Sequence, residues 1–103
     1  MKKTQYLTQL LASEANEVAI ACNKANMFGL DNIYIGSETT KEHLIYKLNH
    51  LTSVVKMLIN IDILPRDWVN EGIQLNHINR IIEQMRISRE LKMLDPQVIP
   101  EVK

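Results

Sequence analysis

The chain has 103 residues, the size of one domain. Twelve basic and twelve acidic side chains cancel, so the composition gives no general attraction to nucleic acid or anionic lipid, and neither is expected as a partner. Apolar residues make up 46% of the sequence, but a chain this short covers only part of its apolar surface, and we therefore expect a homodimer.

Residues 4–27 are predicted to form a first long helix. Its apolar side chains recur at the spacing of helical turns. They are Leu7, Leu11, Val18, Cys22 and Ala25. The single cysteine belongs to this stripe, which favours a small buried apolar side chain over a nucleophile. Gly29 suits a left-handed helix cap, and residues 30–38 are expected to form a connector with no strand long enough to count.

A second helix is predicted to begin at Thr39 and to be stopped by Pro65. Thr39 with Glu42 three residues later fits a capping box. Proline lacks the amide that would continue the helix. The apolar face of this segment is wide, so the helix is expected to be largely buried. That face consists of Leu44, Leu48, Leu51, Val54, Val55, Met57, Leu58 and Ile61.

A third helix is predicted over residues 75–94, with a short helical turn around Trp68 and a break at Gly72 before it. Its inner face is expected to carry Leu75, Ile78, Ile82 and Met85. Asp95-Pro96 ends the helix, and residues 95–103 read as a C-terminal tail. The sequence therefore predicts one all-α domain over residues 1–94.

The predicted fold has three main helices packed as an antiparallel bundle and assembled as a dimer. The loop between the first two helices is about ten residues long, and such helices pack antiparallel. The start of the chain lacks the apolar stretch of a signal peptide. No apolar run is long enough to span a bilayer, so a cytoplasmic protein with no membrane partner is expected.

Glu14 and Glu17 are candidate metal ligands on the first helix, with Lys24 two turns further along the same face. Two carboxylates one turn apart can share a hard cation, and a lysine can meet a phosphate as a point charge. The same pattern is also typical of a solvated helix face. On spacing alone, both interpretations stay open.

The segment 11–31, which includes Glu14, Glu17 and Lys24, resembles the opening of MazG-like nucleotide pyrophosphohydrolases, in particular small phage-encoded members. The resemblance continues through residues 47–58, 63–65 and 87–94. It implies an all-α fold, dimers or dimers of dimers, and hydrolysis of nucleoside triphosphates to monophosphate and pyrophosphate. The implied site binds magnesium through Glu-Glu-x-x-Glu on one helix and Glu-x-x-Asp on the next, and the metal prepares a water for attack.

Three positions depart from that implied site. Ser13 replaces one glutamate of the first motif, and Lys47 and His50 replace both acids of the second. Two like charges at ~4 Å repel by about 4 kcal/mol at an effective dielectric near 20, and a dication doubles this. We therefore expect Glu14 and Glu17 to pair with Lys47, with His50 nearby, and no metal cofactor. A mixed manganese or zinc site of both glutamates and His50 is the alternative.

Partner-binding candidates lie outside this cluster. The third helix has a basic edge, which is either a solvated face with internal pairs or a docking strip. Its arginines are Arg80, Arg86 and Arg89. Trp68 is either a binding hot spot or a plug at the end of the bundle. Tyr34 is either part of an exposed contact loop or part of a lid.

Three functions are consistent with these features. The first is a non-catalytic relative that binds another protein, by analogy a phage-encoded inhibitor of a host factor such as a defence-system ATPase. The second is a metal-dependent pyrophosphohydrolase that uses magnesium or manganese, with Glu42 or an acid of a second subunit completing the site. The third is a nucleotide-binding module in which Lys24 meets phosphate.

Overall fold

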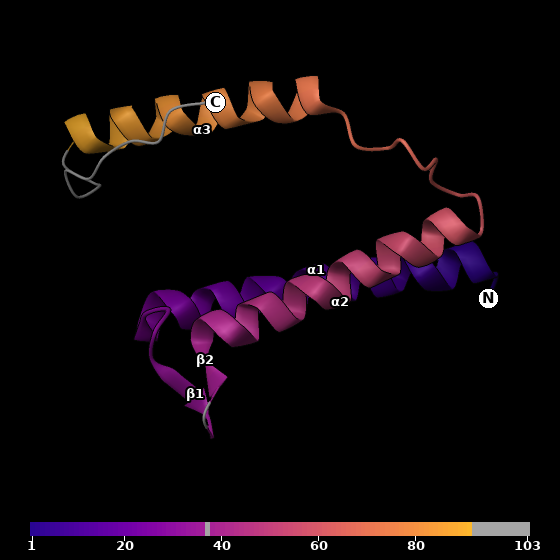
Figure 1. Cartoon of the computed structure of the whole chain (residues 1–103), viewed down its shortest axis with the longest axis horizontal. Coiled ribbons are helices and arrows are strands. Elements are labelled where there is room, and N and C mark those ends of the chain that lie inside the picture. The colour runs from indigo at the N-terminus through magenta and orange to yellow at the C-terminus, as the bar shows by residue number, and fades with distance from the viewer. Residues whose placement is uncertain (37, 92–103) are drawn as a thin grey trace. The chain divides into compact units, whose positions relative to one another are not determined.

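The computed structural model describes residues 1–36 and 38–91, the side chains of 33–35 excepted. In chain order the elements are α1 (Lys3–Phe28), β1 (Ile33–Ile35), β2 (Glu38–Thr39), α2 (Thr40–Asn60) and α3 (Glu71–Glu90) (Figure 1). The predicted all-α class with three main helices is confirmed. The chain divides into two compact units, one ending at Arg66 and the other beginning at Asp67. The predicted tail lies outside the described residues.

Helix α1 ends at a glycine whose backbone needs a special conformation. Gly29 has φ 82° and ψ 155°, a region of backbone space that only glycine occupies without strain. Its N–H donates a hydrogen bond to the carbonyl oxygen of Ala25 at 2.8 Å. The sequence placed the helix end correctly, and the positive φ explains why a glycine stands there.

Replacing Gly29 by alanine is expected to lower the free energy of unfolding by about 1–3 kcal/mol, because the backbone would be strained. An added Cβ would meet no atom within 4 Å, so steric overlap contributes nothing to the loss. Urea denaturation measures the effect. Asn26→Ala, at an exposed position in the same helical turn, is the control and should change stability by less than about 0.5 kcal/mol. Equal stability of Gly29→Ala and the native protein would contradict this account.

A small antiparallel pair of strands follows α1, where the sequence suggested a connector without a strand. Residues Ile33 and Ile35 pair with Thr39 and Glu38, with an irregularity between the two pairs. Gly36, at φ 60°, lies between the strands and allows the chain to reverse. The expectation of a connector without a strand was wrong. A tight turn brings the two short segments next to each other, so even three residues can pair.

Thr40 fastens this connector to the start of α2. Its hydroxyl donates to the carbonyl oxygen of Gly29, and its N–H donates to the carbonyl oxygen of Asn32 at 2.9 Å. The side chain is only 2% exposed. The buried hydroxyl therefore has its hydrogen-bond partner, as buried polar groups require.

The capping box at the start of α2 is confirmed. The hydroxyl oxygen of Thr39 accepts from the N–H of Glu42 at 3.1 Å, and the Glu42 carboxylate accepts from the N–H of Thr39 at 3.3 Å. The predicted stop at Pro65 is wrong, because α2 ends at Asn60. Asp62 adopts φ 60° there, and the chain turns back before the proline is reached.

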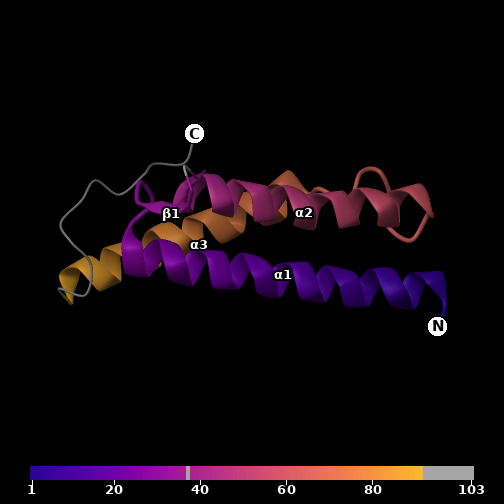
Figure 2. The same cartoon turned by 90° about the horizontal axis from the view of Figure 1, so that it is seen from below.

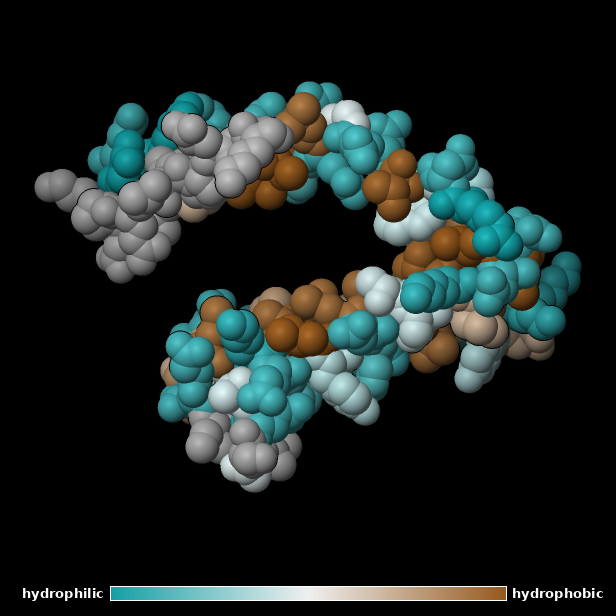
Figure 3. All heavy atoms as spheres, viewed as in Figure 1, coloured by the Kyte–Doolittle hydropathy of each residue, from teal (hydrophilic) through white to brown (hydrophobic). Residues whose placement is uncertain are grey.

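Helices α1 and α2 lie side by side and antiparallel, as predicted (Figures 1 and 2). The seam between them buries Leu7 and Ala21 of α1 and Val54 and Leu58 of α2. The apolar face of α2 is less buried than expected: Leu48 is 42% and Met57 49% exposed. Two helices cover only one stripe of each other, so α1 leaves the rest of this wide apolar face uncovered within the first unit (Figure 3).

Cys22 is exposed, and the prediction of a buried cysteine was wrong. The stripe of α1 that packs on α2 is centred on Leu7 and Ala21. Cys22 follows Ala21 directly, and one helical residue turns the side chain by about 100°. The cysteine therefore points away from the seam.

Helix α3 begins at Glu71, earlier than predicted, and no helical turn forms around Trp68. The side-chain oxygen of Asn70 caps it by accepting from the N–H of Ile73 at 2.9 Å. Gly72 therefore lies inside the first turn and does not break the helix. None of the helices in the described ranges combines the length and apolar character that a bilayer crossing needs.

The predicted inner face of α3 is only partly buried. Ile82 is 7% exposed, whereas Leu75 is 43% and Ile78 44% exposed. Met85 is half-buried. Apolar side chains therefore remain on the surface of the second unit as well.

Candidate functional site

The candidate site is an acid–base cluster between α1 and α2, made of Glu14, Glu17, Lys47 and His50. Each helix contributes two residues three positions apart, and this spacing puts both on one helix face. Because the helices are antiparallel, the earlier acid lies opposite the later base. Glu14 thus faces His50, and Glu17 faces Lys47.

The expected pairing of acids and bases is present in the structure. The Nζ of Lys47 lies 3.6 Å from Oε2 of Glu17, and Nδ1 of His50 lies 3.8 Å from Oε2 of Glu14. The arrangement differs in one respect from the expectation that both glutamates share Lys47. Each glutamate has its own basic partner, and the histidine completes its ion pair when the imidazole is protonated.

The Glu14 carboxylate is the least satisfied group in the cluster. Its Oε2 is buried and accepts no hydrogen bond. The 3.8 Å separation from His50 is within reach of an ion pair but too long for a hydrogen bond. The side chains of Glu14 and Lys47 are each 20% exposed, whereas those of His50 and Glu17 are 38% and 45% exposed. The cluster is therefore half-buried and open to water along one edge.

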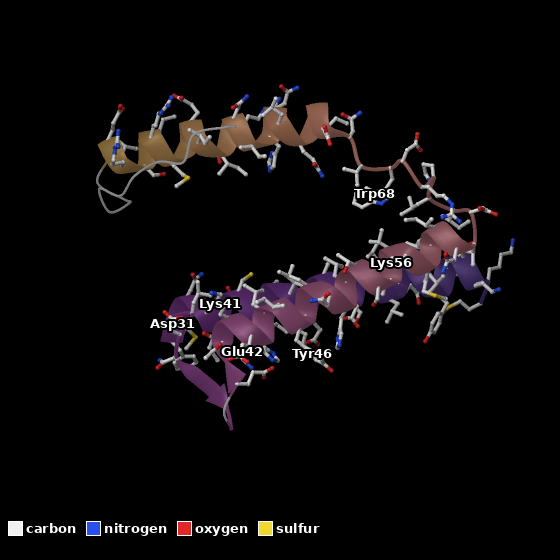
Figure 4. The ribbon with its side chains drawn as sticks, viewed as in Figure 1. Asp31, Lys41, Glu42, Tyr46, Lys56 and Trp68 are labelled. Atoms are coloured by element: carbon white, nitrogen blue, oxygen red, sulfur yellow. The ribbon has the colours of Figure 1, made fainter. Side chains whose placement is uncertain are left out.

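Tyr46 is part of the same surface and is not among the site residues predicted from the sequence. Its ring centroid lies 4.1 Å from that of His50, with the planes tilted by 58°. The Nζ of Lys47 lies 6.0 Å from the Tyr46 ring centroid. Tyr46 is 54% exposed and stands on α2 (Figure 4). The four-residue spacing from His50 was the available signal, since such pairs are neighbours on a helix.

The residues present do not fit the magnesium ion that the family resemblance implies. Magnesium takes a near-octahedral shell of oxygen ligands, and an ammonium group lies 3.6 Å from one of the two carboxylates. In the described ranges no three His, Cys, Asp or Glu side chains are grouped so that they could hold a metal ion. Glu14, Glu17 and His50 are therefore not arranged as the mixed manganese or zinc site. Glu42 engages Thr39 in the capping box.

The remaining candidates of the family motif lie on α1. Ser13 is exposed, and Lys24 is half-buried two turns beyond Glu17. On α2, the Nδ1 of His43 lies 3.3 Å from Oε2 of Glu38. His43 thus continues the row of bases on α2 and engages an acid of β2.

The partner-binding candidates are spread over both units. Tyr34 belongs to β1 of the first unit. Trp68 is 47% exposed and lies in the segment before α3 (Figure 4). The three arginines are exposed on α3. They are Arg80, Arg86 and Arg89. Arg86 pairs with Glu83 at 3.6 Å in a largely exposed ion pair, as expected for the solvated-face interpretation.

Comparison with known proteins adds no identification. No protein-family model matches the chain, and no curated protein or solved structure matches it.

Proposed function

We propose that the protein is a non-catalytic MazG-like helical protein that acts by binding another protein. The observation that supports this is the 3.6 Å separation between Nζ of Lys47 and Oε2 of Glu17. The ammonium group stands where the family pattern has an acid. A dication beside it would be repelled by about 8 kcal/mol at ~4 Å and an effective dielectric near 20.

Without a dication, the cluster lacks the chemistry of pyrophosphate release. In metal-dependent hydrolysis the metal neutralises the phosphates and activates the attacking water. Here the acids of α1 are engaged with bases of α2 and help to hold the two helices together. Partly exposed pairs of this kind contribute about 0.2–1 kcal/mol each. The cluster is thus part of the scaffold, and we propose that activity resides on the outer surface.

Large apolar side chains on the surface support the binding role. In the first unit, Ile20 is 46% and Ile45 49% exposed, and in the second unit Trp68 and Ile87 are each 47% exposed. Contiguous exposed apolar patches mark surfaces that bind other proteins, and we infer that these side chains contribute to such patches. The assembly we propose is a homodimer, and the target is a host protein. A defence-system ATPase is the example by analogy with small phage proteins.

A metal-dependent pyrophosphohydrolase is the second candidate, and one observation favours it. The buried Oε2 of Glu14 accepts no hydrogen bond. Such an oxygen is unusual in a folded protein, and a bound cation would give it a partner. This candidate requires Lys47 to leave Glu17 when the ligand binds.

A pyrophosphate-release assay separates the two candidates. We expect the native protein to release no more pyrophosphate than buffer alone from each of the deoxynucleoside triphosphates, with magnesium or with manganese. The control is the Glu14→Gln, Glu17→Gln double variant, which removes both carboxylates and should behave identically. Release by the native protein that disappears in this variant would establish the enzyme and overturn the proposal.

Capture of a partner from host lysate tests the binding role directly. We expect the native protein to retain a specific protein that a Trp68→Ala or Arg86→Ala variant retains less well. The Glu14→Gln, Glu17→Gln variant should retain the captured protein as the native chain does. The acid–base cluster is far from Trp68 and Arg86 in the sequence, and we propose that it only helps to hold α1 and α2 together. No enrichment by the native protein over repeated trials would contradict the proposal.

A further inference from the structure

A pocket lies at the C-terminal end of α2, within the first unit. Its volume is about 320 Å³, and it is lined by Lys56, Ile59, Asn60 and Arg66. Lys56 stands near the end of the helix (Figure 4). Pockets that bind small molecules have volumes of about 300–1,000 Å³, so this one is at the small end of that range. It is separate from the acid–base cluster, with which it shares no residue.

The carbonyl groups at this helix end are already hydrogen-bonded by the chain itself. The N–H of Ile61 donates to the oxygen of Met57 at 3.2 Å, and that of Asp62 donates to the oxygen of Ile59 at 3.0 Å. The oxygen of Leu58 accepts from Ile63 at 3.0 Å and from Leu64 at 3.3 Å. Backbone N–H groups thus satisfy most of the carbonyl oxygens at the negative end of the helix dipole. Lys56 and Arg66 are therefore not required as helix caps.

Lys56 and Arg66 also lack acidic partners among the described residues. The ion pairs found there join His43 to Glu38, Lys47 to Glu17, His50 to Glu14 and Arg86 to Glu83. Of the residues in the described ranges, those that line the pocket include no carboxylate. Two basic side chains, both on exposed residues, therefore line one open pocket together with the amide of Asn60 and the apolar side chain of Ile59.

We propose that this pocket binds a small organic oxyanion, a phosphate or a carboxylate carried on an apolar group. The guanidinium of Arg66 offers the planar pair of donors that matches either oxyanion, and Lys56 adds a point charge. Ile59 supplies a contact for the apolar part of the ligand. Phosphates and carboxylates share this chemistry, so a choice between them requires measurement.

Calorimetric titration of the full chain with phenyl phosphate, benzoate and inorganic phosphate, at constant ionic strength, tests the proposal. We expect saturable binding of phenyl phosphate or benzoate, weakened by about tenfold or more in Arg66→Gln, since a charge-assisted hydrogen bond is lost. Stronger binding of phenyl phosphate would assign a phosphate ester, and stronger binding of benzoate a carboxylate. Inorganic phosphate should bind less tightly than phenyl phosphate because it makes no contact with Ile59.

The matched control is Arg80→Gln, which removes the same charge from an exposed position on α3. It should bind both probes as the native protein does, and so should the Glu14→Gln, Glu17→Gln variant. Thermal unfolding verifies that each variant is folded. No saturable binding by the native protein at millimolar probe, or equal weakening in Arg66→Gln and Arg80→Gln, would overturn the proposal. Neither result depends on whether the acid–base cluster binds metal.

Discussion

Replacing Lys47 by glutamate together with His50 by aspartate is expected to give the protein a divalent-metal site. These changes place acids opposite Glu17 and Glu14. In the native protein, Lys47 lies 3.6 Å from Glu17 and His50 lies 3.8 Å from Glu14. Four carboxylates on two adjacent helices repel one another when no cation is present. The variant should therefore be less stable than the native protein without metal and should regain stability when magnesium or manganese binds.

Thermal unfolding with and without metal, followed by calorimetric titration, measures this effect. At a metal concentration 100 times the dissociation constant, the gain is about 2.7 kcal/mol. The control variant, Lys41→Glu with His77→Asp, makes the same change of charge at exposed positions outside the cluster. Neither it nor the native protein should respond to metal. A double variant that metal fails to stabilise, or a control that metal stabilises equally, would count against the account.

Truncation of Leu58 to alanine is expected to be the most damaging single change in the first unit. Its side chain is 2% exposed at the seam between α1 and α2. Leucine-to-alanine changes at such sites lower the free energy of unfolding by about 2–5 kcal/mol. The free energy of unfolding of a small domain is only about 5–15 kcal/mol. The variant should therefore lose a large share of its stability, which a urea titration measures.

The matched control is Leu48→Ala, the same truncation on the same helix at a side chain that is 42% exposed. We expect it to lose less than half as much stability as Leu58→Ala, because it leaves no enclosed cavity. Equal losses would mean that Leu48 is as well covered as Leu58 in solution. The described packing of α1 on α2 would then be an incomplete account of the core.

Features set by local chemistry could be predicted from the sequence. The helix start at Thr39 follows from the reciprocal hydrogen bonds between Thr39 and Glu42, which depend on residues three positions apart. That the acids of the cluster meet bases was expected, whereas the expectation that both glutamates share Lys47 differs from the separate Lys47–Glu17 and His50–Glu14 pairs. Two acids and two bases, each pair three residues apart on antiparallel helices, can meet in only one order.

Other features depended on how the chain closes on itself. The end of α2 is set by the positive φ of Asp62 and by backbone N–H groups after the helix that donate to carbonyl oxygens of its last turn. The sequence predicted the end at Pro65 instead, because proline is the more visible stop signal. The start of α3 depends on the side chain of Asn70, a cap that lies before Gly72, whereas the sequence predicted a break at Gly72. The burial of Thr40 depends on the strand pair before it and on the Gly29 carbonyl oxygen to which its hydroxyl donates, and both come from parts of the chain brought together by folding.

Calorimetric titration of the unmodified protein with manganese is the most direct test of whether Lys47 and His50 exclude a metal ion from the site between α1 and α2. With Lys47 and His50 in place, no saturable binding with a dissociation constant below about 1 mM is predicted. Saturable binding in the micromolar range that is lost in the Glu14→Gln, Glu17→Gln variant would contradict the account.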